Sequence, residues 1–446
     1  MLPRFEVVGR RRPIALVAAT ATLVDAREPE ASYATPHPAP YAGVTAVPGP
    51  EAERVELELA SGEVRLVGWY DAASGRLGLE VTTSGRTTKH ASRRHGRAAT
   101  KLQQLGLTLT GTHLTVLGRE AGRWVARGRV DLAGRFDPRN EAWLAGLHSS
   151  HRGDVSRFSA GGFGQLGLRD IRWVTRADGT PYRDGAALLL TATSAGPGFF
   201  DTGHTSVWAL DPASLTLEHR ADLFFRRPDR PGVFGDHATH LVREGEEWLV
   251  ATSTWGDFDG RRKDASVAVT VARSSADLLA GRHVLDTVHL DLPTTGLTSV
   301  GVWDPHLVRT PEGWLVAYVS AQRFFQFHPV LAEGPSLDRL TLRGAAPDRL
   351  ATEGTTLLRL DEGWRLLASD GPDGRSGQRR RYPIFDLHLT EIGELDAPYP
   401  TNIPWPSLAR QGDDWLMATF DGTAYGGDVV GYGSHGDVVL MRGVSP

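Results

Sequence analysis

Apolar and polar positions recur as a repeated unit over the C-terminal two thirds of the chain. In each unit an apolar strand ends in arginine, a short polar turn follows, and a second apolar strand begins with tryptophan five residues after the arginine. The four clear copies are Leu241–Ala251, Leu307–Ala317, Leu357–Leu367 and Leu408–Ala418. Two apolar strands around a short polar turn are typical of a β-hairpin.

A degenerate fifth copy precedes these four. It reads Ile171–Val174, and after a longer turn it continues as Ala187–Ala192. Further β-rich segments follow the clear copies, for example Val267–Ala272 and His283–Leu292. Four strands per unit at a period of roughly 50 to 66 residues are typical of propeller blades. The pattern therefore predicts an all-β chain with a five-bladed β-propeller over residues 161–446.

The last copy offers only three strands, and the third of them is Val438–Arg442. An incomplete final blade would leave an unpaired sheet edge, which folded proteins avoid. We therefore expect a segment upstream of Asp170 to supply the missing outer strand.

The N-terminal part alternates differently, with short strand-like segments and polar turns between residues 53 and 132. This pattern is typical of a β-sandwich and is similar to the concanavalin-like jelly rolls. We expect the sandwich within residues 1–140 and a linker over 141–160. Two interpretations of the sandwich stay open: a carbohydrate-binding module and a structural companion of the propeller.

Composition narrows the range of functions. The 446 residues are 40% apolar and 23% charged, as in a soluble globular protein, and the length suits two domains. A net charge of −4 argues against a nucleic-acid partner. The absence of cysteine excludes disulfides and thiolate sites. No apolar stretch reaches the roughly 18 residues of a membrane span, so no membrane partner is expected. The start resembles a signal peptide only weakly, which favours a cytoplasmic protein, with secretion as the alternative.

Acidic residues precede the repeats at nearly constant spacing. The innermost strand of each blade lines a propeller's axis, so residues leading into the repeats should converge at one end of it. Counting back five to seven positions from the repeat arginine, or from its counterpart Thr175, gives Asp170, Asp236, Asp304 and Glu353 in blades one to four. The fifth blade has Trp405 there.

These residues resemble the acid set of glycoside hydrolase family 43 and of its fructosidase and levansucrase relatives. The resemblance rests on Asp170, on Asp304 followed by proline and on Glu353 followed by glycine. It implies that Asp170 is the base or nucleophile, Glu353 the acid, and Asp304 the group that raises the pKa of the acid and orients the sugar. The chain departs from the family at Ile171 and Thr355, where proline is usual, and so would be a divergent member.

Two carboxyls suffice for glycoside hydrolysis, because one protonates the leaving oxygen and the other activates water or attacks carbon. The sequence therefore predicts a glycosidase cleaving a furanoside or pentose-containing glycan, similar to arabinofuranosidases and arabinanases. Two alternatives stay open: a fructosyl-linkage glycosidase and a non-catalytic carbohydrate-binding propeller. In each case the expected partner is a carbohydrate.

Aromatic, imidazole and carboxyl groups near these positions are candidates for binding the sugar. They are Asp236, His237, Trp255, Trp303, His306 and Trp405. His435 resembles the histidine that some family relatives point at an axial calcium. No cofactor is expected to be required, and a structural calcium at the axis, next to His435, is the one metal that the resemblance implies.

Overall fold

The computed structural model describes residues 2–27, 32–430 and 435–444. Strands dominate these residues, and the one α-helix among them is α1 (Glu141–Ala145), besides the short 3₁₀ turns η1 (Phe200–Thr202) and η2 (Asp428–Val430). The prediction of an all-β chain is confirmed. Among the described residues, no helix has the length and apolar character that crossing a bilayer requires.

Two six-stranded sheets form the N-terminal part and are called here the N-terminal sheet pair. The first has the order β11 (Arg123–Asp131), β10 (His113–Glu120), β9 (Gln104–Thr110), β4 (Tyr41–Pro48), β13 (Val155–Gln165) and β2 (Ala15–Ala26). The second has the order β3 (Ser32–Ala34), β12 (His148–Arg152), β5 (Arg54–Ser61), β6 (Val64–Asp71), β7 (Arg76–Thr83) and β8 (Arg86–His90).

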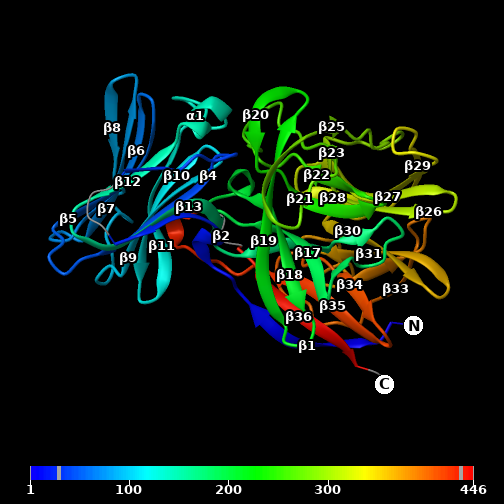
Figure 1. Ribbon diagram of the computed structural model, residues 1–446. Coiled ribbons are helices and arrows are strands. Elements are labelled where there is room, and N and C mark those ends of the chain that lie inside the picture. Colours follow the sequence, from blue (N-terminus) through cyan, green and yellow to red (C-terminus); the bar gives the residue numbers. More distant parts are fainter. Residues whose placement is uncertain (1, 28–31, 431–434, 445–446) are drawn as a thin grey trace.

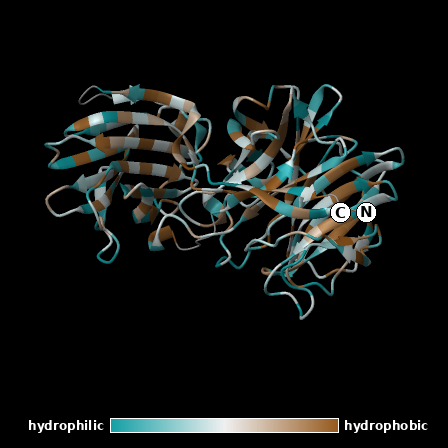
Figure 2. Cartoon of the chain, turned by 90° about the horizontal axis from the view of Figure 1, so that it is seen from below, coloured by the Kyte–Doolittle hydropathy of each residue, from teal (hydrophilic) through white to brown (hydrophobic). Residues whose placement is uncertain are grey.

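The two sheets of this pair share one apolar core. Alternate side chains along each strand point to opposite faces, so one face of each sheet collects the apolar residues. Leu57, Leu79, Leu107, Val116 and Phe158 are fully buried in this core. Figure 2 shows hydrophobic and hydrophilic positions alternating along these strands.

Five further sheets follow and are called here ring sheets 1 to 5. Sheet 1 contains β14 (Leu168–Trp173), β17 (Ala187–Ser194), β18 (His204–Asp211), β19 (Thr216–Arg227) and β20 (Arg230–Phe234), with β16 (Arg183–Asp184) and β24 (Gly281–Asp286) attached. Sheet 2 contains β15 (Thr175–Arg176), β21 (His237–Glu244), β22 (Glu247–Ser253), β23 (Val269–Ser274) and β25 (Val288–His289).

The last three ring sheets have four strands each. Sheet 3 contains β26 (Gly301–Thr310), β27 (Gly313–Arg323), β28 (Gln326–Gly334) and β29 (Thr341–Ala345). Sheet 4 contains β30 (Thr352–Leu360), β31 (Gly363–Asp370), β32 (Pro383–Phe385) and β33 (Glu391–Glu394). Sheet 5 contains β34 (Ser407–Gln411), β35 (Asp414–Asp421), β36 (Asp437–Val444) and β1 (Arg4–Arg11).

The ring sheets pack in cyclic order through separate apolar clusters. Four of the clusters each join one sheet to the next, and the fifth contains residues of sheets 5 and 1 together with residues of sheets 2 and 3. Their members include Leu189 with Leu241, Leu249 with Val316, Leu315 with Leu366, Leu367 with Met417, and Leu416 with Leu190. The five sheets therefore enclose a common centre.

The strand β1 completes ring sheet 5, although it lies more than 400 residues before its partner in the chain. It pairs antiparallel with β36, from Arg4 opposite Val444 to Arg11 opposite Val438. In Figure 1 the blue β1 lies beside the red β36. The prediction that an upstream segment supplies the missing outer strand is confirmed.

The expected boundaries need correction at two places. Residues 141–160, expected as a linker, contain α1, β12 and the first half of β13, and both strands pair within the N-terminal sheet pair. The glycines of β13 conceal it as a strand, since glycine is depleted in strands. Gly161 is required there, because a Cβ on it would lie 2.2 Å from the carbonyl oxygen of Ala21 in β2. Residues 4–11, expected in the sandwich, belong to the ring.

The arginine and tryptophan of each clear repeat face each other across its hairpin. Arg243 pairs with Trp248 and Arg309 with Trp314 in register. Each guanidinium lies over the partner indole, 4.9 Å and 5.9 Å from its centre respectively. Both indoles are buried between neighbouring sheets, so the repeat is a packing unit rather than part of a binding surface.

The sheet pair packs directly against ring sheet 1. Tyr41 of β4, Phe163 of β13 and Phe224 of β19 are buried in one cluster, and the rings of Tyr41 and Phe224 stack with centroids 5.3 Å apart. Figure 1 shows β2 and β13 of the pair next to β19. The two parts are therefore joined by a continuous apolar contact.

Because β1 closes the ring, its buried side chain should be important for stability. Phe5 is 1% exposed and packs with Met417 and Met441. We predict that Phe5→Ala lowers the free energy of unfolding by about 3 to 5 kcal/mol in urea titrations. Val8→Ala on the same strand, where the side chain is 43% exposed, is the control and should change it by less than about 0.5 kcal/mol. Equal effects of the two variants would contradict a closing role for β1.

Candidate active site

In each of ring sheets 1 to 4, the strand that precedes the turn of the repeat is interrupted at an equivalent position. Regular pairing breaks at 169–172 in β14, 237–240 in β21, 303–306 in β26 and 353–356 in β30. One residue in each break has positive φ: 51° at Asp170, 60° at Ala238, 57° at Asp304 and 70° at Gly354. Such bulges redirect side chains out of the sheet, and strained non-glycine residues of this kind cluster at functional sites.

A pocket of about 260 Å³ lies where these four bulges meet. Its polar wall includes Arg169, Asp170, His237, Asp304, Glu353, Asp373 and Asn402. Its aromatic wall consists of Phe200, Trp255, Phe258, Trp303, Phe324, Phe325, Phe327 and Trp405. The structure thus brings together the three carboxyls singled out by the sequence, with four of the six side chains expected to bind sugar.

Asp170 is held in place from two sides. The Thr193 hydroxyl on β17 donates a hydrogen bond of 2.7 Å to its Oδ2. His237 Nδ1 lies 3.9 Å from the same oxygen, and Arg169 Nε lies 4.0 Å from Oδ1. These contacts fix the position of the Asp170 carboxyl at the wall of the pocket.

Glu353 retains its proton to neutral pH. Burial and then the charge of Asp170 raise the pKa of this carboxyl to about 7, although the charge of Arg169 acts in the opposite direction. The pKa of a carboxyl that donates protons near neutral pH must lie in this range. Glu353 is therefore the carboxyl of the pocket that is suited to donate a proton near neutral pH.

Asp304 is the least exposed of the three carboxyl residues. Its side chain is buried at 3% exposure, and Oδ2 has no hydrogen-bond partner among the described residues. Burial, followed by the charges of Glu353 and Asp170, raises its pKa well above the usual range. This differs from the sequence expectation that Asp304 raises the pKa of Glu353. A neutral carboxyl exerts little repulsion, so Asp170 is the charge that does so.

Asp236 and His306, both expected to bind sugar, do not line the pocket. Asp236 is fully buried, accepts hydrogen bonds from the Arg227 guanidinium and accepts one of 3.0 Å from the amide of Gly256. His306 Nδ1 accepts from the amide of Leu357, and its ring stacks on His240 with centroids 4.1 Å apart. Their polar atoms stabilise the surrounding backbone, so the expectation is corrected for both.

The sequence analysis missed Arg172, which lies beneath the pocket. Its guanidinium donates to the carbonyls of Thr355 at 2.7 Å and Asp304 at 2.9 Å, and it lies 4.6 Å from the ring centre of Trp405. The side chain is 1% exposed, and burial lowers its pKa to about 10, so it remains charged. Its one sequence signal is that it lies three positions before Thr175, as His240 and His306 lie three positions before the arginines of their repeats.

A calcium ion does not fit this centre. Oxygen ligands are what calcium requires, and the Arg172 guanidinium engages the two carbonyls beneath the pocket. His435 lies in a small cavity with Arg169, Asp170 and Thr193, beside a cation rather than a set of oxygen ligands. No three histidine, aspartate or glutamate residues within the described ranges are arranged to hold a metal. The expected role of His435 as a metal ligand finds no support in its surroundings.

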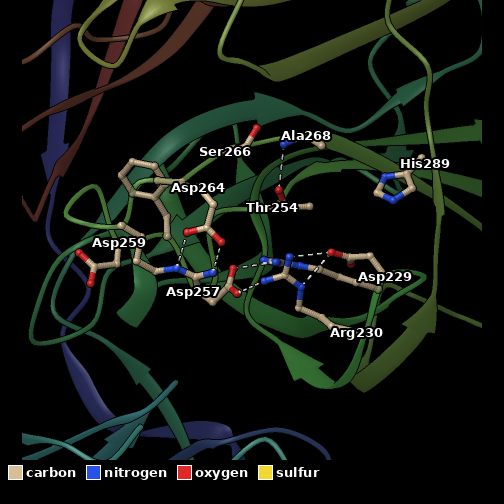
Figure 3. A pocket seen from close by; sticks show the side chains of 13 residues that line it. Asp229, Arg230, Thr254, Asp257, Asp259, Asp264, Ser266, Ala268 and His289 are labelled. Atoms are coloured by element: carbon tan, nitrogen blue, oxygen red, sulfur yellow. Dashed lines mark hydrogen bonds and ion pairs between the residues drawn. The ribbon is translucent and has the colours of Figure 1, made fainter. Parts of the chain in front are cut away.

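A second, charged pocket of about 140 Å³ adjoins the first and shares Phe258 with it. Asp257 accepts hydrogen bonds of 2.7 Å from both Arg227 and Arg230, and Arg230 also pairs with Asp229 at 2.7 Å. Figure 3 shows Asp257 at the centre of these contacts. Their charges compensate one another, so the network fixes the loop that carries Trp255 and Phe258.

No protein-family model matches the chain, and no curated protein matches it, so the resemblance to family 43 gains no support from either.

Among solved structures, an inulosucrase from Halalkalicoccus jeotgali bound to kestose is 13% identical, with a TM-score of 0.49 over 63% of this chain and 85% of that one. A family 117 glycoside hydrolase of Zobellia galactanivorans is 12% identical, with a TM-score of 0.44 over 62% and 84%. A levansucrase of B. megaterium is 8% identical, with a TM-score of 0.45 over 63% and 83%. All three TM-scores lie below 0.5, so an assignment of function rests on the residues of the pocket.

Proposed function

We propose that this chain is a glycoside hydrolase, in which the ring sheets are the blades of a five-bladed β-propeller and the N-terminal sheet pair is a β-sandwich of the jelly-roll type. One observation carries the proposal: three carboxyls from three sheets line a single aromatic pocket, and one of them, Glu353, has a pKa of about 7. Paired carboxyls in opposite protonation states are what glycoside hydrolysis requires.

The three carboxyls take different roles in this proposal. Glu353 is the general acid, because its buried proton is available to the leaving oxygen at neutral pH. Asp170, fixed by Thr193, is the base that activates water or the nucleophile that attacks the anomeric carbon. Asp304 is neutral and donates a hydrogen bond that orients the sugar. No step is assigned to a metal, since the Arg172 guanidinium binds the carbonyls beneath the pocket.

The pocket suits one terminal sugar rather than the middle of a polymer. Its volume of about 260 Å³ lies near the lower end for small-molecule sites, about 300 Å³. Aromatic faces such as Trp303 and Trp255 stack on the apolar face of a sugar ring. We propose a furanoside or pentose residue as the sugar, with an arabinofuranoside as the first choice. A fructosyl residue would use the same three roles.

The direct test is a panel of nitrophenyl furanosides and pyranosides, sucrose-type fructosides and arabinans. The wild type should hydrolyse at least one of them, and Asp170→Asn should hydrolyse none. Sugar binding by calorimetry without hydrolysis would instead favour the non-catalytic carbohydrate-binding alternative.

Acid and base variants should fail differently. Glu353→Ala should slow substrates with poor leaving groups by about 10² to 10⁴-fold and largely spare activated aryl glycosides, which depart without a proton. Asp170→Ala should abolish turnover of both kinds, because nothing then activates water or attacks carbon. Steady-state kinetics on the two substrate kinds measure this. Equal losses for both variants on both kinds would contradict the assigned roles.

Substitution of Asp304 should leave the pH profile in place. The basic limb of kcat/KM near pH 7 reports the proton of Glu353. The charge that raises the pKa of Glu353 is that of Asp170, so Asp304→Asn should lower kcat/KM without moving this limb. Movement of the limb to lower pH would show that Asp304 carries the charge that raises the pKa of Glu353.

The proton of Glu353 should also be visible in stability. A carboxyl that ionises near pH 4.5 when unfolded and at about 7 when folded favours the folded state fully below pH 4.5. As the pH rises from 4.5 to 7, this contribution to the free energy of unfolding decreases by about 2 to 3 kcal/mol. The unfolding free energy of Glu353→Gln relative to wild type should therefore grow by that amount between pH 4.5 and 7 and then stay constant. A difference that does not vary with pH would refute the raised pKa.

A further inference from the structure

One wall of the carboxyl pocket is a loop that reaches the N-terminal sheet pair. Residues 195–203 connect β17 to β18 and contain η1. Consecutive side chains of η1 face different parts of the molecule. Phe200 lines the pocket, whereas the Asp201 carboxyl faces His113 of the sheet pair.

Phe200 connects this loop to the proposed catalytic groups. Its ring lies 4.5 Å from that of Trp255, and its carbonyl oxygen lies 3.0 Å from His237 Nε2, within hydrogen-bond distance. The other ring nitrogen of His237 lies 3.9 Å from Asp170 Oδ2. A shift of this loop would therefore change both the aromatic wall and the surroundings of Asp170.

Asp201 anchors the loop on the sheet pair. Its Oδ2 lies 3.2 Å from His113 Nδ1 at the start of β10, and its side chain is 19% exposed. The charges of Arg129 on β11 and of Arg139 before α1 act on the same carboxyl, against the charge of Asp131. Arg261, between β22 and β23 of the ring, also interacts with the Asp201 carboxyl, but its side chain is exposed and pairs with Asp259.

Backbone contacts hold the loop from the same side. The Tyr41 hydroxyl donates a hydrogen bond of 2.8 Å to the carbonyl of Gly203. A Cβ on Gly111 would lie 2.4 Å from the carbonyl oxygen of Asp201, and one on Gly198 would lie 2.8 Å from Arg129 Nη2. Glycine is needed at both positions for this close approach, so the loop is packed tightly against the sheet pair.

We propose that Asp201 is a positioning residue and that the N-terminal sheet pair, through His113 and Arg129, holds Phe200 and His237 in the geometry that binds the sugar. This inference rests on the proposed glycosidase function. It gives the sheet pair a part in the active site, whether or not the pair binds carbohydrate itself.

Stability alone does not explain an ionised carboxyl at this position. Burial raises the pKa of Asp201 to about 6 in spite of the two arginines. The pKa of this carboxyl in the unfolded chain is near 3.8, so at higher pH its ionisation lowers the stability of the folded state. A neutral isostere should leave the protein at least as stable at pH 7. Positioning of the loop is a function that such a substitution would remove.

The test compares wild type with Asp201→Asn at pH 7. We expect KM for the substrate found in the panel to rise about tenfold, kcat to change less than about threefold, and Tm to stay equal or rise. Asp184→Asn is the matched control: it removes an exposed carboxylate of ring sheet 1 that pairs with Arg220 at 3.4 Å, and it should alter neither constant. An unchanged KM in Asp201→Asn would overturn the proposal.

A double-mutant cycle identifies the route of the effect. If Asp201 acts through His113, then His113→Gln should raise KM similarly, and the double variant should be no worse than either single variant. If the increase in KM of the double variant equals the product of the two single increases, the assigned route through His113 is overturned.

Hydrogen exchange separates this inference from the proposed function. Peptides covering residues 195–203 should exchange at least about tenfold faster in Asp201→Asn than in wild type, and equally fast in Asp184→Asn. This readout needs no substrate. If the wild type hydrolyses nothing in the panel, the proposed function fails, but faster exchange would still support the anchoring by Asp201. Unchanged exchange would overturn it, whatever the activity.

Discussion

The centre of the ring depends on the buried guanidinium of Arg172. This side chain starts on ring sheet 1, donates to carbonyls of ring sheets 3 and 4, and stacks on Trp405 just before ring sheet 5. A charge that is removed from water must be hydrogen-bonded, or the folded state loses several kcal/mol. The two carbonyls meet this demand only when the sheets are in place, so one side chain couples most of the ring to the floor of the pocket.

The same cation makes three neighbouring carboxyls tolerable. Like charges within one buried pocket repel strongly, and proteins respond by protonating some of them. Arg172, beneath the pocket, lowers the pKa of Asp304, and Arg169, in the wall of the pocket, lowers that of Glu353. Both charges thus offset part of the increase in these pKa values. The pKa values of Glu353 and Asp304 nevertheless both remain raised. The role of Glu353 as proton donor in the proposed chemistry follows from its raised pKa.

Much of this arrangement could be predicted from the sequence, because its causes are local. The step from arginine to tryptophan marks a hairpin whose two ends face each other, and its recurrence indicates repeated sheets. Counting back from the arginine located Asp170, Asp304 and Glu353 correctly at the pocket. The same count could not distinguish Asp236, because the bulge decides which side chain turns outward, and at that bulge His237 does so.

Other features depend on contacts between distant segments. A charged residue within an apolar strand, such as Arg172, is ordinarily expected to face solvent, and only the assembled ring shows why it does not. The strand β13 is rich in glycine because β2 passes close to it, and the sequence contains no record of that neighbour. The position of Phe200 in the pocket wall also could not be predicted from the sequence, since its loop is held in place by groups of the N-terminal sheet pair.

The pairing of β1 with β36 has a consequence for biosynthesis. During translation, the strand Arg4–Arg11 is synthesised more than 400 residues before its partner Asp437–Val444. Until then both β1 and the edge that it will cover are open to pairing with other chains. Cotranslational folding can complete the N-terminal sheet pair early, but ring closure must wait, and the nascent chain depends on that interval passing without misassembly.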